Sequence, residues 1–371
     1  MIQTALVYSG VMLLMLFFAR LSSLRLKGIS PVRFSIPFWT WENICIILVF
    51  ILFYGVRYDV GVDHLDYMET YQTGYGLDRY EPIFRMIAVS LRQAKVHFSI
   101  YFAVCAFFQI FFILYSIKNE RFLFPFLILS LFMGQFFWHW MNVIRQDIAA
   151  CIYVCAVTFI VERKLFKFLL LIILAIGFHK SSILLLPTYF LLYKGKDWTY
   201  NRLFQIFLLW FVGYLAIVKI DVLSIIFPII DDISKLMEYE RYSEKAIQSL
   251  GEKTSTGIGL FVFLCLDTLI VLNSKKLKVY YNSKKFIIYY NLYYWGMLLQ
   301  LFLINNLLLA RPVRFFRCFK LLMIAYFLYY LYKHPKPHMR ITLLFIVMVL
   351  LALLFVSIIV NEPYYFFWSA S

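Results

Sequence analysis

The chain has 371 residues, of which 63% are hydrophobic and 15% are charged, and its formal net charge is +16. Soluble globular proteins contain about 45–50% apolar and about 25% charged residues, so the composition excludes that class. Apolar runs of about 20 residues recur along the chain, which predicts an all-α, polytopic membrane protein. The sequence contains no nucleic-acid-binding motif, so the positive charge needs another explanation.

The apolar runs predict about twelve transmembrane helices in a single integral membrane domain of residues 1–371. The first run lacks the basic segment and the small-residue cleavage site of a signal peptide, which favours a retained helix. The short run at 182–193 could form a broken or re-entrant unit with the run before it. The expected spans are 2–19, 40–56, 97–117, 122–140, 143–161, 165–178, 182–193, 202–219, 257–273, 286–305, 318–332 and 341–360.

Basic residues gather in alternate loops between these spans. They are Arg20, Arg25, Lys27, Arg33, Lys118, Arg121, Arg163, Lys164, Lys167, Lys194, Lys196, Arg202, Lys275, Lys276, Lys278, Lys284, Lys285, Lys333, Lys336 and Arg340. The positive-inside rule places these loops in the cytoplasm and both termini outside. The net charge therefore indicates contact with anionic membrane lipid rather than nucleic acid.

Two long loops, 57–96 and 220–256, are expected outside, where they would line an outward-facing chamber. The first is acidic and aromatic, and its apolar residues Ile83, Met86 and Ile87 recur at helical spacing. This spacing predicts a helix that lies on the membrane interface. The second loop is acidic and predicts a short amphipathic helix followed by a tail rich in Gly, Ser and Thr.

Five arginines lie beside outer membrane edges, where the positive-inside rule predicts few: Arg57, Arg145, Arg311, Arg314 and Arg317. A charge near the centre of a bilayer costs about 2.5–3.5 kcal/mol, so such residues usually face a polar cavity. A guanidinium can grip phosphate with two parallel hydrogen bonds, and lipid phosphates or diphosphates are the anions found at a membrane. Ion pairing with the acids of loop 57–96 is the alternative explanation.

Other polar side chains mark the same outer side. The spacing of His139, Asn142 and Gln146 predicts that they share one helix face. His179 directly follows the 165–178 run and is the best candidate for a general base, with His64 and His139 as further candidates. A lone histidine is more often structural than catalytic, so this assignment rests on position.

The six cysteines lie in or beside apolar runs, without histidines at metal-ligand spacing. We therefore expect neither a disulfide nor a metal ion. The sequence contains no nucleotide-binding glycine loop and no HExxH motif, and it predicts no cofactor.

Four motifs follow one another between residues 50 and 190. They are Arg57-x5-Asp63-x2-Asp66-Tyr67, Glu81-Pro82-x-Phe84, Asn142-x2-Arg145-Gln146-x-Ile148-Ala149 and Ala175-x2-Phe178-His179-x-Ser181. Together they resemble the EpsG/Wzy family of bacterial polysaccharide polymerases. The resemblance extends weakly to Arg311-x2-Arg314-Phe315, and His64 departs from the family pattern.

This resemblance implies a metal-independent glycosyltransferase with a GT-C-like architecture and an outward-facing chamber, in the bacterial inner membrane. Such enzymes join oligosaccharide repeat units carried on undecaprenyl pyrophosphate into O-antigen, capsule or exopolysaccharide. A flippase and a chain-length regulator are the implied partners. Catalysis would fall to His179, Asp66 or Glu81. Pyrophosphate or sugar would contact Arg57, Asp63, Tyr67, Asn142, Arg145, Gln146, Lys180, Ser181, Arg311 and Arg314.

Two other functions remain open on the sequence. A flippase or transporter of lipid-linked sugars needs polar groups through the whole bilayer, whereas the centres of most spans are Leu, Ile and Phe, with Asp267 as the main exception. A membrane O-acyltransferase that modifies polysaccharide could use the same histidine.

Overall fold

The computed structural model describes residues 2–25, 37–199, 201–218, 257–304, 310–360 and 363–369. Apart from loops, these residues are helical except for β1 (Arg57–Tyr58) and β2 (Tyr365–Phe366), which pair antiparallel. Five helices in the described ranges are long and apolar enough to cross a membrane, or seven if each of two bent pairs forms one span. The all-α membrane class is confirmed. The expected number of about twelve spans is not, because several apolar helices are shorter.

Each expected apolar run overlaps one to three consecutive helices. Up to residue 195 the helices are α1 (Ile2–Arg25), α2 (Trp41–Gly55), α3 (His64–Thr73), η1 (Leu77–Arg79), α4 (Pro82–Gln93), α5 (Phe98–Ser116), η2 (Arg121–Leu123), α6 (Phe124–Met133), α7 (Phe136–Asn142), α8 (Ile144–Val161), α9 (Leu165–Phe178), η3 (Lys180–Leu185) and α10 (Thr188–Leu192). They are followed by α11 (Arg202–Val218), α14 (Ile258–Leu272), α15 (Ser274–Tyr281), α16 (Lys284–Phe302), η4 (Pro312–Phe316), α18 (Arg317–Lys333), α19 (Pro337–Val360) and η5 (Phe367–Ser369).

One break corrects the expected spans, and a second lies beside the expected boundary between 122–140 and 143–161. The run at 122–140 is not straight, because its two halves meet at an angle of 67° around Gly134 and Gln135. Gln135 has φ of 60°, a left-handed conformation that ends the helical path. A second break separates α7 from α8 at Val143, with φ −93° and ψ 56°. The helix predicted within loop 57–96 is confirmed as α4, and its place on the membrane interface stays a prediction. The helix predicted in loop 220–256 lies outside the described residues.

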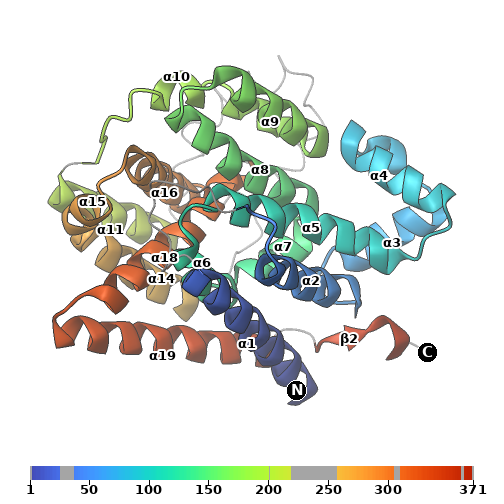
Figure 1. The fold of residues 1–371 in the computed structure, drawn as a ribbon, viewed down its shortest axis with the longest axis horizontal. Coiled ribbons are helices and arrows are strands. Elements are labelled where there is room, and N and C mark those ends of the chain that lie inside the picture. Colours follow the sequence, from blue (N-terminus) through green and yellow to red (C-terminus); the bar gives the residue numbers. More distant parts are fainter. Residues whose placement is uncertain are drawn as a thin grey trace. The chain divides into compact units, whose positions relative to one another are not determined.

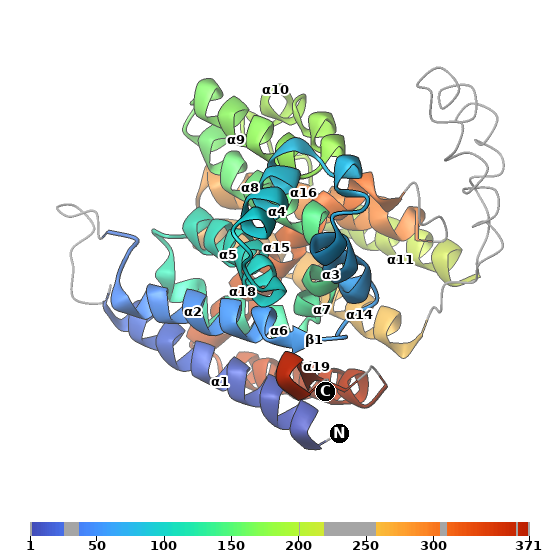
Figure 2. The same cartoon turned by 90° about the vertical axis from the view of Figure 1, so that its right-hand side faces the viewer.

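The described residues pack as two compact units, Met1–Gly195 with Leu321–Ser371, and Lys196–Lys320. In the first unit α8 lies between α5 and α9, and α2 packs against α1 and α5 (Figures 1 and 2). The start of α4 packs against the end of α9, where Gly177 meets Ile83. A Cβ atom at residue 177 would lie 2.3 Å from Cδ1 of Ile83, so glycine permits this close approach.

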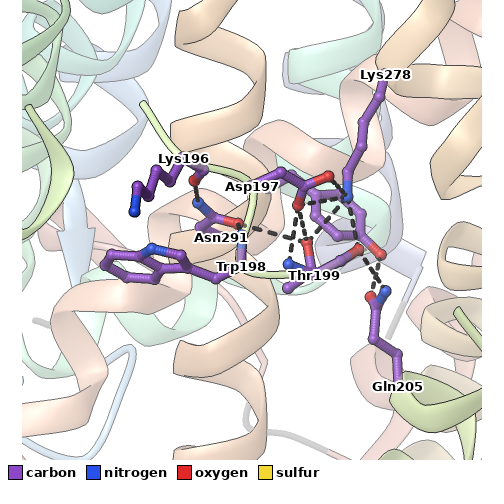
Figure 3. A network of polar contacts seen from close by, with 8 residues as sticks. Lys196, Asp197, Trp198, Thr199, Gln205, Lys278 and Asn291 are labelled. Carbon is purple, nitrogen blue, oxygen red and sulfur yellow. Dashed lines mark hydrogen bonds and ion pairs between the residues drawn. The ribbon is translucent and has the colours of Figure 1, made fainter. Parts of the chain in front are cut away.

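A hydrogen-bond network organises the second unit around the segment before α11 (Figure 3). Lys278 of α15 donates to both carboxylate oxygens of Asp197, at 2.8 Å each. On α16, Asn291 accepts the backbone N–H of Trp198 at 3.2 Å and donates to the carbonyl of Lys196 at 2.7 Å. The segment is therefore fixed to α15 and α16 together.

The second unit also contains a buried ion pair between two apolar helices. Nζ of Lys320, on α18, lies 2.6 Å from Oδ2 of Asp267, on α14. The hydroxyl of Tyr293, on α16, donates to Oδ1 of the same carboxylate at 2.9 Å. Asp267 is 1% exposed, so these two contacts satisfy the carboxylate that interrupts its apolar run.

Candidate active site

Arg145 lies in the first turn of α8, with 27% of its side chain exposed. Its Nη1 donates to Oε2 of Glu81 at 2.6 Å, and its Nε donates to the hydroxyl of Tyr67 at 3.4 Å. The guanidinium also lies over the rings of Tyr80 and Phe84, 4.9 Å and 5.9 Å from their centroids. Side chains from α3, α4 and the turn before α4 thus fix the orientation of this cation.

Glu81 links Arg145 to the end of α9. It precedes α4 as its N-cap residue, and Pro82 at the first helical position presets the backbone for helix formation. Oε1 of Glu81 lies 3.3 Å from Nδ1 of His179 and accepts the backbone N–H of Lys180 at 3.2 Å. One carboxylate, 9% exposed, therefore joins residues from α8 and from the α9–η3 junction.

The position of His179 follows from the way α9 ends. Its backbone is extended, with φ −156° and ψ 112°, and its N–H closes the last turn of α9 by donating to the carbonyl of Ala175 at 2.8 Å. The chain direction changes at this residue, so the next backbone N–H, that of Lys180, points to Glu81 rather than along the helix. The sequence predicted this end of the helix correctly.

The charges of this cluster act on Glu81. Burial raises the pKa of Glu81, but the hydrogen bond from His179 and the charge of Arg145 lower it more, from 4.5 to about 2. Glu81 is therefore an anion at neutral pH and a weak base. Burial raises the pKa of Tyr67 to about 12 despite the nearby Arg145, so this phenol stays neutral.

We call Glu81, Arg145 and His179 the Glu81 cluster. A guanidinium, an imidazole and a backbone N–H converge on a single anionic group, and these are the groups that bind phosphate in proteins. The predicted ion pairing between an outer arginine and an acid of loop 57–96 is confirmed for Arg145 and Glu81. Within the described ranges, no group of three or more His, Cys, Asp or Glu side chains is placed to hold a metal ion.

A second polar pair bridges α7 and α8. Nδ1 of His139 lies 2.6 Å from Oδ2 of Asp147, which is 1% exposed. The sequence analysis assigned no role to Asp147. It placed His139, Asn142 and Gln146 on one helix face, which is wrong because the helix breaks at Val143. Eight residues span about 12 Å along an unbroken helix, so only this break allows the pair to touch.

Buried side chains from other elements satisfy the last carbonyls of α7. Nη2 of Arg57 donates to the carbonyl of Met141 at 2.9 Å. Nε2 of Gln109 donates to the carbonyl of Trp140 at 3.1 Å, and the Tyr54 hydroxyl donates to the same carbonyl. Arg57, a predicted substrate ligand, is thus in the interior, and its Nε and Nη1 have no hydrogen-bond partner among the described residues.

The other predicted site residues of the first unit lie around α3 and η3. Asp66 is exposed on α3, and Asp63 is the N-cap residue of that helix. Ser181 is half-buried beside Lys180 in η3, and Asn142 is half-buried at the end of α7. His64 is fully buried, and burial lowers its pKa to about 3, so it stays neutral.

The predicted phosphate-binding arginines near the C-terminus lie in the second unit. Arg311 precedes η4 and is exposed, Arg314 is half-buried within it, and Arg317 begins α18. Their binding of pyrophosphate stays a prediction.

One of the comparisons with known proteins gives a match. A family model described as the EpsG family matches residues 41–369, which include every candidate site residue named above. No curated protein and no solved structure matches the chain.

Proposed function

Because the chain belongs to the EpsG family, and is therefore a membrane protein of polysaccharide biosynthesis, we propose that it is a polysaccharide polymerase. It acts on oligosaccharide repeat units linked to undecaprenyl pyrophosphate, on the outer face of the cytoplasmic membrane. The growing chain moves from its lipid pyrophosphate to a non-reducing sugar hydroxyl of a new lipid-linked unit. The observation that carries the proposal is the Glu81 cluster, in which Glu81 and Tyr67 hold Arg145 at the start of α8.

The reaction makes two demands on the site. A bond forms between the acceptor oxygen and the anomeric carbon, while the bond from that carbon to the pyrophosphate oxygen breaks. The acceptor hydroxyl must lose a proton, and the leaving pyrophosphate must gain positive charge or hydrogen-bond donors around its oxygens. The site therefore needs a base and a group of fixed donors.

Arg145 supplies the donors for the leaving group. A phosphate oxygen has the same sign of charge and the same acceptor geometry as the Glu81 carboxylate, so Arg145, His179 and the N–H of Lys180 can bind it in a similar way. The contacts to Tyr67 and Tyr80 fix the guanidinium before substrate arrives. Loss of one such preorganised donor typically costs about 2.7–4 kcal/mol in the transition state. Arg311 and Arg314, in the second unit, are candidates for pyrophosphate binding on the sequence pattern alone.

Deletion of the gene tests the proposal in cells. We expect polymer to disappear and lipid-linked single repeat units to accumulate on the outer face. Accumulation on the inner face would instead indicate a flippase, and persistence of long chains would indicate an acyltransferase. These outcomes separate the three functions that the sequence left open.

Complementation with single variants then tests the site. We expect Arg145→Ala and His179→Ala each to abolish polymer while the protein stays in the membrane. The matched control is Arg85→Ala, because Arg85 is exposed on α4 and outside the Glu81 cluster. Polymer of normal length with Arg145→Ala would remove Arg145 from the active site.

A further inference from the structure

The donors of the Glu81 cluster are already taken by a carboxylate of the protein itself. Nη1 of Arg145 donates to Oε2 of Glu81 at 2.6 Å. The backbone N–H of Lys180 donates to Oε1 at 3.2 Å, and Nδ1 of His179 lies 3.3 Å from the same oxygen. A pyrophosphate oxygen that binds these groups therefore competes with Glu81 for them.

Arg145 keeps other contacts that do not depend on Glu81. Its Nε donates to the hydroxyl of Tyr67 at 3.4 Å, and its guanidinium lies over the ring of Tyr80. The side chain of Arg145 is 27% exposed, whereas that of Glu81 is 9% exposed. A ligand that arrives from outside thus meets the guanidinium before the carboxylate, and the cation stays in place when the carboxylate is displaced.

The carboxylate of Glu81 can leave without disturbing its own helix. Glu81 is the N-cap residue of α4, but its side chain makes no capping hydrogen bond to that helix. Its contacts are instead with α8 and with the α9–η3 junction. The first turn of α4 carries partial positive charge, which favours a nearby anion, so a displaced carboxylate still has a favourable place to occupy.

We propose that Glu81 is a built-in competitor of the lipid pyrophosphate for Arg145. It holds the guanidinium while the site is empty, gives it up when lipid-linked substrate binds, and takes it back as undecaprenyl pyrophosphate leaves. The inference rests on the proposed polymerase function. A competing anion weakens the binding of substrate and product alike, so Glu81 keeps the released lipid pyrophosphate from occupying the site.

The contacts of Glu81 set the size of the expected effect. They lower its pKa from 4.5 to about 2, so the cluster favours the charged carboxylate over the neutral acid by up to about 300-fold. A ligand that displaces the carboxylate has to overcome this preference. Glu81→Gln removes the charge, although the amide can keep one hydrogen bond. The Kd of this variant for undecaprenyl pyrophosphate should therefore be about 10-fold to about 300-fold lower.

Binding to purified full-length protein in detergent tests this exchange. The probe is undecaprenyl pyrophosphate, and undecaprenol, which lacks phosphate, is the control ligand. Glu81→Asp keeps the charge on a shorter side chain that no longer reaches Arg145 as closely, so its Kd should fall part of the way. The matched controls are Glu69→Gln and Asp78→Asn, since both residues are exposed and lie outside the Glu81 cluster. Their Kd should equal that of the unchanged protein.

Inhibition by product gives a second readout. The substrate is the lipid-linked repeat unit extracted from cells that lack the gene, and polymer length is measured on a gel. Added undecaprenyl pyrophosphate should inhibit Glu81→Gln at concentrations about 10-fold or more below those that inhibit the unchanged protein. A loss of turnover with an unchanged Kd would show that Glu81 serves the chemical step, and would overturn the inference.

A loss of stability cannot imitate the expected result, because unfolded protein binds less ligand. A Kd of Glu81→Gln equal to or above that of the unchanged protein would overturn the inference, since Glu81 would then only position Arg145. If Glu81→Gln shows no cooperative unfolding transition, the Kd of Glu81→Asp decides in the same way. Each of these results leaves the proposed function standing. Failure of the unchanged protein to extend the lipid-linked repeat unit would overturn both.

Discussion

Replacing Glu81 by Gln removes the one anion that Arg145 and His179 share. The pKa of Glu81 falls from 4.5 to about 2 when the protein folds, because the contacts of His179 and Arg145 outweigh burial. At about 1.36 kcal/mol per pKa unit, this difference corresponds to about 3 kcal/mol of folding free energy. Removing one partner of a buried ion pair typically costs about 3–5 kcal/mol, which is of the same size. Glu81 is 9% exposed, so screening by solvent is limited.

The sign of the pH dependence follows from the lowered pKa. The stabilisation is present above pH 4.5 and is lost as the pH falls toward 2, because a protonated Glu81 no longer attracts its partners. We expect Glu81→Gln to lower the unfolding temperature at pH 7 by on the order of 5 °C. The difference between the two proteins should shrink to less than about half near pH 3.

Tryptophan fluorescence during heating measures this difference in detergent, at several pH values between 7 and 3. Glu69→Gln is the matched control, since Glu69 is exposed on α3 and should show no comparable loss. Equal unfolding temperatures for Glu81→Gln and the unchanged protein at pH 7 would refute the reasoning. So would a difference that is constant across the pH range.

Two further predictions concern buried charges away from the Glu81 cluster. Arg57→Met should lower the unfolding temperature, because it removes a buried hydrogen-bond donor to the end of α7 at a cost of about 1–3 kcal/mol. It should also lower kcat while KM changes less. A rise in KM with kcat unchanged would instead support direct binding of substrate by Arg57. Asp267→Asn and Lys320→Met should each destabilise the protein by about 3–5 kcal/mol, because each leaves one charge of a buried ion pair without its partner. The double variant Asp267→Leu with Lys320→Met should recover part of this loss. A double variant whose loss of stability equals the sum of the two single losses would contradict the ion pair.

Helix positions could be predicted because they follow from hydrophobicity alone. The expected span 165–178 has the same bounds as α9, and the expected span 143–161 begins one residue before α8. Helix length could not be predicted as well. The apolar runs say where a helix forms, but not whether a 15-residue helix such as α2 crosses a membrane.

The candidate site could be predicted in part. Arg145 was found because arginines at outer membrane edges are expected to be rare, and His179 because it directly follows an apolar run. Glu81 was found as an acid of loop 57–96 and through the family resemblance. The structure brings these three residues together. The pair of His139 and Asp147 was missed, although the expected spans 122–140 and 143–161 separated the two residues, because a span boundary does not give the angle between two helices. A sequence rule could find such a pair only if it also predicted how the two helices meet.

The expected spans 122–140 and 143–161 put a boundary beside this break, but no helix-breaking residue marks it. Neither proline nor glycine occurs between His139 and Asp147, so the usual helix breakers are absent. The structure supplies a tertiary cause instead. The carbonyls of Trp140 and Met141 accept hydrogen bonds from the side chains of Arg57, Gln109 and Tyr54. In a continuing helix, these carbonyls would accept backbone N–H groups four residues further on.

The same contacts explain why a fully buried arginine belongs to this fold. By ending α7, the carbonyl bonds from α2, β1 and α5 give α8 a free N-terminus, and its first turn presents Arg145 to Glu81 and Asp147 to His139. The N-terminal turn of a helix also carries partial positive charge, which favours an anion nearby. The hydrogen bond of Arg57 helps to set where α8 begins, and so how Arg145 meets Glu81 and how Asp147 meets His139. Arg57 can therefore affect catalysis without touching substrate.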